Sequence, residues 1–290
     1  MRSPWKPWFV HRPRQLARRV GQLFAAPPTG LVSVTLPWGA TVRVNPAETV
    51  GRAVWTTGVY DPAVCEALFR LMPAGGSALD AGANVGVLTT LLAAKAGPAG
   101  RVECFEPHPL LVGRLRENVG RSAGRVAVRA LALSDRVGVA RFVTPPDFAA
   151  NEGVGRLSDG PTADGFDVPT ATLDALFPAD RFDLLKLDVE GHEAAVLRGA
   201  AAMLARGAIR HVVFEDHAIA ASAAAGILVA AGYALRQLGW AMRGPVTAAL
   251  GAPRLCRDYE APSYLATLDP AGAATLLAPR GWRIYDRRPA

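Results

Sequence analysis

The sequence predicts an α/β fold in which a doubly wound, mostly parallel sheet carries helices on both faces. From residue 77 onward short apolar strands alternate with helical segments, and the strands are nearly continuous hydrophobic runs, as expected for strands buried on both faces. Polar residues follow five of these strands. Because the carboxyl ends of parallel strands share one edge of the sheet, this pattern predicts a ligand site at that edge.

Composition and charge narrow the class of protein. The chain has 290 residues, of which 50% are hydrophobic and 20% charged, as in a globular protein. The formal net charge of +7 comes largely from residues 1–19, which contain no acid. Three scattered cysteines argue against a disulfide framework or structural zinc and fit a reducing cytoplasm. The uncharged run 218–235 is rich in Ala and predicts a helix and a strand rather than a membrane span.

Two segments precede the predicted sheet. Residues 1–30 form a basic, Trp-bearing arm without the apolar core of a signal peptide. The arm is expected either to pack partly ordered on the body or to touch anionic lipid or nucleic acid. Residues 31–76 form an extension: alternating apolar residues predict a hairpin over 31–46, and Asp61-Pro62 predicts the start of a helix over 63–71.

The main domain is predicted over residues 77–267, followed by a tail over 268–290. Strands are expected at 77–80, 101–105, 126–133, 137–143, 182–187, 209–214, 233–238 and 263–267. Helices are expected at 85–96, 109–119, 193–204 and 219–231. Residues 144–166 show little periodicity and predict a long loop, which in a compact domain is usually functional or mobile.

A glycine-rich turn with the spacing D-x-G-x-N-x-G runs from Asp80 to Gly86, directly after the first strand of this sheet. Glycine allows a backbone to approach a ligand closely, and the helix that follows offers free N–H groups. Glu106 ends the next strand, where an acid can bind both hydroxyls of a ribose. Neither G-x-G-x-x-G nor a P-loop occurs, so a nucleoside without phosphate, such as S-adenosylmethionine, fits better than a dinucleotide or triphosphate.

Five segments resemble, in order and spacing, the FkbM family of S-adenosylmethionine-dependent methyltransferases. They are residues 80–86, 105–107, 132–135, 172–174 and 186–193. The resemblance covers about residues 50–267. It implies the class I methyltransferase fold, a Rossmann-like sheet of seven strands whose last strand is antiparallel. It also implies O-methylation of a sugar, a glycan or another small hydroxyl compound such as a secondary metabolite.

The resemblance also implies which residues bind the cofactor. Its methionine part is assigned to Asp80, Gly82, Asn84 and Gly86. Glu106 should bind the ribose, and Ser134 and Asp135 should flank the adenine. Asp188 should lie beside the sulfonium and the acceptor. His192 stands where the resemblance leads us to expect a small residue, and it either lies on the surface or faces the acceptor.

Methyl transfer to a hydroxyl needs the acceptor oxygen close to the methyl group and a base for its proton. The candidate bases are Asp188, Glu190 and His217. In an alternative, Mg²⁺ bound by a set of oxygen ligands would lower the pKa of the hydroxyl and orient a diol. The residues considered for that set are Asp188, Glu215 and Asp216. Glu190 could instead pair with Lys186 and serve structure only.

The acceptor is expected to be a small molecule or a glycan, held by Tyr60, by loop 144–166 and by residues 240–262, which include Trp240, Arg243, Arg257 and Tyr259. Two other functions stay open. An RNA methyltransferase could use the basic arm, although no Asp/Asn-Pro-Pro-Tyr segment or catalytic Cys loop occurs. A non-catalytic cofactor-binding module is the other, and the intact motifs argue against it. We expect a cytoplasmic protein, with peripheral contact of the arm with the inner membrane face as an alternative.

Overall fold

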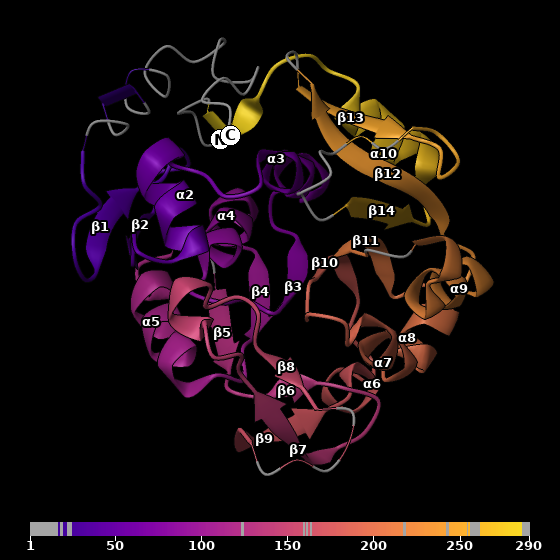
Figure 1. Cartoon of the computed structure of the whole chain (residues 1–290). Helices are drawn as coiled ribbons and strands as arrows, with labels where there is room; N and C mark the ends of the chain where they lie inside the picture. Colours follow the sequence, from indigo (N-terminus) through magenta and orange to yellow (C-terminus); the bar gives the residue numbers. More distant parts are fainter. Residues whose placement is uncertain are drawn as a thin grey trace.

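An eight-stranded mixed sheet forms the centre of the structure, which is a computed structural model (Figure 1). The structure describes residues 17, 20–21, 25–122, 125–158, 160, 162, 164–216, 219–241, 244–253, 255 and 262–285. The strands are β3 (Ser77–Ala81), β4 (Arg101–Phe105), β5 (Arg125–Arg129), β10 (Phe182–Leu187), β11 (Ile209–Glu215), β12 (Ala234–Ala241), β13 (Gly244–Ala248) and β14 (Ser263–Thr267). Their order across the sheet is β13-β12-β14-β11-β10-β3-β4-β5.

The strand order confirms the predicted α/β class. β5, β4, β3, β10 and β11 pair in parallel, and β14 is inserted antiparallel between β11 and β12. The described part of the sheet has one strand more than the seven expected. β13 is the addition, because the chain turns back after β12 and pairs with it antiparallel. This extra strand lies at the edge of the sheet and leaves the order of the others unchanged.

Helices cover both faces of the sheet. One face carries α3 (Pro62–Leu71), α4 (Val87–Ala96) and α10 (Pro270–Leu277), which share a core with Leu184 and Val213 of the strands. The other face carries α7 (Glu193–Arg198), α8 (Ala201–Ala205) and α9 (Ala223–Ala230), which share a core with Leu185 and Val212. Neighbouring residues of β10 and β11 therefore enter opposite cores, as strand geometry requires. Two further helices are α5 (Pro109–Val119) and the single-turn α6 (Leu173–Leu176).

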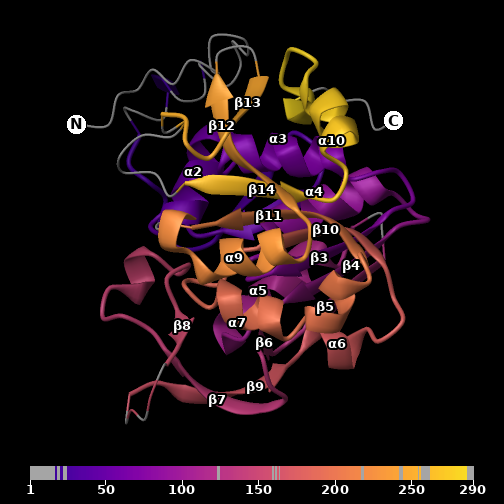
Figure 2. The same cartoon turned by 90° about the vertical axis from the view of Figure 1, so that its right-hand side faces the viewer.

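The expected strand 126–133 is divided between two sheets. It turns after β5, and its last two residues form β6 (Ala132–Leu133) in a separate sheet of order β6-β9-β7-β8. The other strands of this small sheet are β7 (Gly138–Val143), β8 (Arg156–Leu157) and β9 (Phe166–Ala171). Residues 144–166 are therefore not wholly loop, since they contain β8, the 3₁₀ turn η2 (Phe148–Ala150) and the start of β9. Figure 2 shows the small sheet at the opposite end of the molecule from α10 and β13.

Three helical segments also differ from expectation. The helix expected at 193–204 is divided at Gly199, where a Cβ would lie 2.0 Å from the carbonyl oxygen of Ser134. The helix expected at 219–231 begins as a 3₁₀ turn, η3 (Ile219–Ala221), before Ser222 caps α9. Helix α2 (Thr49–Thr57) was not predicted, because its N-cap is Glu48 rather than one of the usual capping residues. Among the described residues, no helix is long and apolar enough to span a membrane.

The predicted hairpin is present and attaches directly to the glycine-rich turn. Strands β1 (Val32–Thr35) and β2 (Thr41–Val44) pair antiparallel, and together with α2 they form a cap that shares a core with Val85 and Leu111. The side chain of Asn118 joins the two parts. Its amide nitrogen donates to the carbonyl oxygens of Arg43 and Val85, and its oxygen accepts from the N–H of Arg43. The cap thus lies over the turn that follows β3.

Residues 270–285 are tied into the same core by a buried ion pair on α3. Arg70 and Glu66 form that pair, and both side chains are fully buried. Arg70 donates to the carbonyl oxygens of Leu277, Pro279 and Gly281, and Glu66 accepts from the N–H groups of residues 283 and 284. These bonds fix α10 and η4 (Arg283–Tyr285) against α3.

Candidate active site

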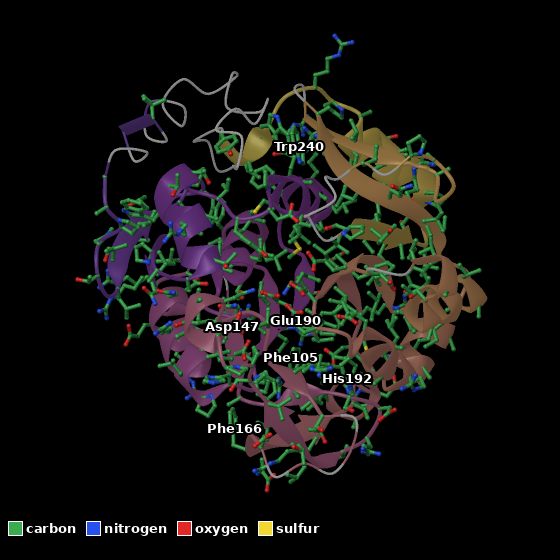
Figure 3. The ribbon with its side chains drawn as sticks, in the orientation of Figure 1. Phe105, Asp147, Phe166, Glu190, His192 and Trp240 are labelled. Carbon is green, nitrogen blue, oxygen red and sulfur yellow. The ribbon has the colours of Figure 1, made fainter. Side chains whose placement is uncertain are left out.

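A cavity lies at the carboxyl ends of β3, β4 and β10, between the cap and the small sheet. Its walls come from the turn after β3, the residues after β4, the segment 131–133, the turn after β10, Tyr60 of the cap and residues 151–157. It encloses about 1130 Å³ of space, its open mouth included. Figure 3 shows Phe105, Glu190 and His192, all of which line this cavity, close to one another at the centre of the molecule. The predicted gathering of strand ends is therefore present.

The glycine-rich turn is held close to the turn after β10. Gly82 has a φ of +73°, and a Cβ at this position would lie 1.8 Å from the carbonyl oxygen of Asp188. The N–H groups of Gly82 and Ala83 donate to the carbonyl oxygen of Phe105, at 3.1 and 2.9 Å. Gly86 caps α4 with a φ of +87°, and it faces Leu115 rather than the cavity. Only glycine at position 82 permits this approach of two backbones.

Glu106 is held in the wall of the cavity by two main-chain donors. Its Oε2 accepts from the N–H of Asn84 and its Oε1 from the N–H of His108, each at 2.9 Å. The residue is 5% exposed. Burial raises its pKa to about 7, although the two hydrogen bonds by themselves lower the pKa. Because each carboxylate oxygen has a second lone pair, the group can also accept from two hydroxyls of a ligand. Two hydroxyl donors of a ribose would require such a pair of acceptor oxygens, and the ribose-binding role of Glu106 stays a prediction.

An apolar slot adjoins Glu106. Its walls are Phe105, Pro107, Leu131, Leu133, Phe142 and Leu157. Ser134 and Asp135, predicted to flank the adenine, do not line this cavity. Ser134 Oγ lies 2.9 Å from His192 Nε2, and Asp135 forms an exposed ion pair with Arg198. Apolar side chains of this kind can pack against a flat base. From this segment, residues 131–133 rather than 134 and 135 line the cavity. His192 itself lines the cavity.

Asp80 lies below the cavity rather than in its wall. It is fully buried, and its Oδ2 accepts from Thr89 Oγ1 at 2.6 Å. Lys186 separates it from the cavity, with Nζ 3.5 Å from Asp80 Oδ1 and 3.4 Å from Asp188 Oδ2. Burial lowers the pKa of Lys186, but the carboxylates of Asp188 and Asp80 outweigh burial and raise it overall. Lys186 therefore forms its ion pairs with these two aspartates and not with Glu190, the partner considered above.

Carboxyl groups crowd the turn after β10. Glu190 lines the cavity with a φ of +53°, and burial together with Asp188 raises its pKa to about 7. Burial, Asp188 and Asp61 raise the pKa of Glu215 to about 9. Glu193, which the sequence did not single out, accepts through Oε1 from two N–H groups of the turn, residues 189 and 191, at 3.1 and 3.2 Å. These two bonds support a turn that contains a non-glycine residue at positive φ.

Tyr60 faces the same carboxyl groups from the cap. It lines the cavity, and burial followed by the charges of Asp188 and Glu215 raises the pKa of its hydroxyl. A tyrosine that keeps its proton can donate a hydrogen bond to a ligand oxygen. The predicted contribution of Tyr60 to the acceptor site is therefore compatible with its position, and its role stays a prediction.

Residues 148–157 cover the part of the cavity near Glu106. Phe148 stacks on the ring of His108, with 4.6 Å between centroids and 21° between planes. Glu152 forms an ion pair with Arg114 of α5, and Thr49 Oγ1 donates to the carbonyl oxygen of Ala150 at 3.3 Å. The segment expected to hold the acceptor thus packs beside Glu106, the residue proposed to bind the ribose. Its apolar contacts with His108 were invisible in the sequence, because they join residues far apart.

Several predicted residues are not placed in this cavity. His217, Arg243, Arg257 and Tyr259 lie outside the described residues, as does most of the basic arm. Trp240 lies well away from Glu190 (Figure 3). In the described part of the chain, no group of three or more His, Cys, Asp or Glu side chains is arranged to hold a metal ion. The Mg²⁺ set of Asp188, Glu215 and Asp216 therefore gains no support.

Comparison with known proteins adds independent evidence. The model of the FkbM methyltransferase domain matches residues 80–235. The chain is 33% identical over 142 residues to the hexuronic acid methyltransferase AglP of Haloferax volcanii, covering 48% of this chain and 55% of that protein. It is 26% identical over 300 residues to the AMB antimetabolite synthetase AmbE of Pseudomonas aeruginosa, covering 89% of this chain and 13% of that protein. The chain thus spans about half the length of one relative and a small part of the other.

A solved structure with a similar fold is the precorrin-6y C5,15-methyltransferase of Geobacter metallireducens. It is 13% identical, with a TM-score of 0.43 over 76% of this chain and 93% of that one. The strand order, the cavity at the carboxyl ends of the strands and a family match over more than half of the sequence agree with one another. The chain belongs to the FkbM family of S-adenosylmethionine-dependent methyltransferases.

Proposed function

We propose that this protein transfers a methyl group from S-adenosylmethionine to a hydroxyl of a sugar, a glycan or another small metabolite. The residues around the cavity fit this cofactor: Glu106 suits the ribose and the apolar slot suits the adenine. One observation carries the proposal for the chemistry. Glu190 lines the same cavity beside Asp188, and its pKa is raised to about 7.

Glu190 is the proposed general base. S-adenosylmethionine, when bound, supplies an activated methyl group, so the protein must position a hydroxyl and remove its proton. A base works best when its pKa is near the operating pH, and such a group typically contributes about 10²–10⁴-fold to the rate. Glu190 meets this condition because burial and the neighbouring Asp188 disfavour its charged form. Tyr60, which also lines the cavity, is the proposed donor to a second oxygen of the acceptor.

The acceptor class is supported by the two relatives. AglP is named a hexuronic acid methyltransferase and AmbE an antimetabolite synthetase, so one points to a sugar and the other to a secondary metabolite. A polyhydroxylated acceptor suits a cavity end that presents carboxyl and phenol groups. We therefore place sugars and glycans first and small hydroxylated metabolites second.

The test supplies labelled S-adenosylmethionine to the purified chain together with neutral sugars, uronic acids, hydroxylated amino acids and RNA. The expected product carries the label on oxygen, as an O-methyl resonance in NMR spectra. A label on nitrogen or carbon, or on RNA alone, would overturn the proposal. Cofactor binding without transfer to any acceptor class would instead favour the non-catalytic module.

A matched pair of variants connects the product to the site. Glu190→Gln should remove transfer to the hydroxyl, whereas Glu117→Gln should retain it. Glu117 is an exposed residue of α5 that pairs with Arg43, outside the cavity. Equal loss in both variants would show that the effect does not come from the proposed base.

A further inference from the structure

Three charged side chains form a row beneath the glycine-rich turn. Asp80 and Lys186 are register partners across β3 and β10, and Asp188 follows one residue after β10 ends. Lys186 Nζ lies 3.5 Å from one carboxylate and 3.4 Å from the other. Two carboxylates and one ammonium give this charge row, Asp80–Lys186–Asp188, a formal net charge of −1.

The charge row is poorly solvated at its inner end and open at its outer end. Asp80 is fully buried and the Lys186 side chain is 6% exposed, whereas the Asp188 side chain is 33% exposed. Asp80 Oδ1 is buried without a hydrogen-bond partner, so its Coulomb attraction to Lys186 at 3.5 Å is its main compensation. A buried charge is tolerated when it is paired with an opposite charge. Here the single ammonium can neutralise only one of the two carboxylates, so one negative charge remains.

Lys186 also fixes the turn that forms the cavity wall. Its ammonium donates to the carbonyl oxygens of Ala81 and Gly82, at 3.1 and 2.6 Å. An ammonium has three protons, so two of them hold the main chain and one is left for the carboxylates. The charge row and the glycine-rich turn are consequently held in one frame, and both Lys186 and Asp188 face the cavity.

We propose that the charge row is the counter-charge for the sulfonium of S-adenosylmethionine and that Lys186 is a positioning residue that sets its net charge to −1. One excess negative charge matches one sulfonium. Without the ammonium, the two adjacent carboxylates would repel each other, and with one carboxylate fewer the row would be neutral. The inference deepens the proposed function, since it uses the same cavity and donor, but it does not depend on the identity of the acceptor.

This arrangement distinguishes the donor from its product. Methyl transfer breaks the S–C bond and leaves its electron pair on sulfur, while the acceptor oxygen gains the carbon and gives up its proton. S-adenosylhomocysteine is therefore neutral at sulfur and loses the attraction of the charge row. The predicted consequence is that the wild-type chain binds S-adenosylmethionine more tightly than S-adenosylhomocysteine, which favours product release.

The test measures both dissociation constants by calorimetry, without any acceptor. Asp188→Asn and Asp80→Asn each remove one negative charge, so each should lower the preference for S-adenosylmethionine over S-adenosylhomocysteine by about tenfold. Lys186→Met should move the preference the other way, and Lys186→Arg should leave it as in the wild type. Loss of packing alone would weaken both ligands equally and leave their ratio unchanged.

The control removes a carboxylate from the opposite end of the same strand. Asp180 precedes β10 and pairs with Arg101, so Asp180→Asn should leave the ratio unchanged. If the ratio of the two dissociation constants were unchanged in both Asp188→Asn and Asp80→Asn, the inference would be overturned. This test does not need Lys186→Met to fold. A shifted ratio in a chain that methylates no hydroxyl would retain the inference and refute the proposed function, and binding of neither ligand by the wild type would refute both.

Discussion

The two ends of the cavity are built from different parts of the chain. At the donor end the main chain makes the contacts: two N–H groups hold the carboxylate of Glu106, and two others join the glycine-rich turn to Phe105. At the end proposed for the acceptor, side-chain carboxyl groups crowd together, and Glu190 and Glu215 have raised pKa values of about 7 and 9. Apart from the charge row, the proposed donor end is thus shaped by backbone geometry, and the proposed acceptor end by carboxyl groups with raised pKa values.

This difference separates two kinds of variant. A change at the donor end should alter the affinity for S-adenosylmethionine, because it disturbs contacts that exist before any acceptor binds. A change at the acceptor end should alter the rate and its pH dependence at nearly constant cofactor affinity.

The largest effect is expected for Glu190→Gln. Loss of the general base should reduce kcat by about 10²–10⁴-fold, with the dissociation constant of S-adenosylmethionine changed less than about threefold. In the wild type, kcat should rise with pH and level off above about 7, because the base acts only when deprotonated. Glutamine does not titrate, so this inflection should disappear from the residual rate, which stopped-time assays over a pH series would show. An inflection that persists in the variant would assign it to another group.

Gly82→Ala should produce the next largest effect, at the donor end. The new Cβ would meet the carbonyl oxygen of Asp188 at 1.8 Å in a backbone with φ of +73°. Strain and overpacking together should lower the free energy of unfolding by about 3 kcal/mol and weaken cofactor binding on the order of 100-fold. Gly232→Ala is the matched control, since Gly232 also has a positive φ, +87°, but faces open space. The control should lower the free energy of unfolding by only about 1 kcal/mol, measured by denaturant unfolding. An equal loss in both variants would show that the close approach of Gly82 to Asp188 is not the cause.

The donor end was largely predictable from sequence because its parts are local. The spacing of Gly82 and Asn84 and the position of Glu106 at the next strand end follow from one strand, one turn and one helix. The fold class followed from the same alternation of elements. What the alternation could not show was β13, or that the segment containing Leu131 leaves the main sheet to join a second one.

The acceptor end was less predictable because its residues meet only through tertiary contacts. Lys186 and Glu190 are close in sequence, yet strand register directs Lys186 to Asp80, and the chain turns at Glu190 itself, which has a φ of +53°. Tyr60 reaches the same place from a cap whose helix α2 has an unusual N-cap. The short strand β8 pairs only with distant β7 and carries no periodicity of its own.

Glu106→Gln should have an intermediate effect that is confined to the cofactor. Glutamine would direct an NH₂ group toward one of the two N–H groups that now donate to the carboxylate, and it would offer the ribose fewer acceptors. We expect the dissociation constant of S-adenosylmethionine to rise about tenfold, as for one lost hydrogen bond to a charged group. Glu103→Gln is the control on the same strand, because Glu103 pairs with Arg129 and does not line the cavity. If kcat fell while the affinity stayed constant, the two ends would not be separable.

The smallest effect is expected for Phe148→Ala, in the segment that covers the donor end. Removing the ring that stacks on His108 at 4.6 Å should raise the dissociation constant of S-adenosylmethionine about fivefold, since an aromatic pair contributes about 0.5–1.5 kcal/mol beyond burial. Asp147→Asn, at the exposed neighbouring position, should change nothing. The sequence assigned this segment to the acceptor, which makes the opposite prediction: a raised KM for the acceptor at constant cofactor affinity. Calorimetry without acceptor and steady-state kinetics with it distinguish the two, because only a segment that packs over Glu106 changes cofactor binding in the absence of acceptor.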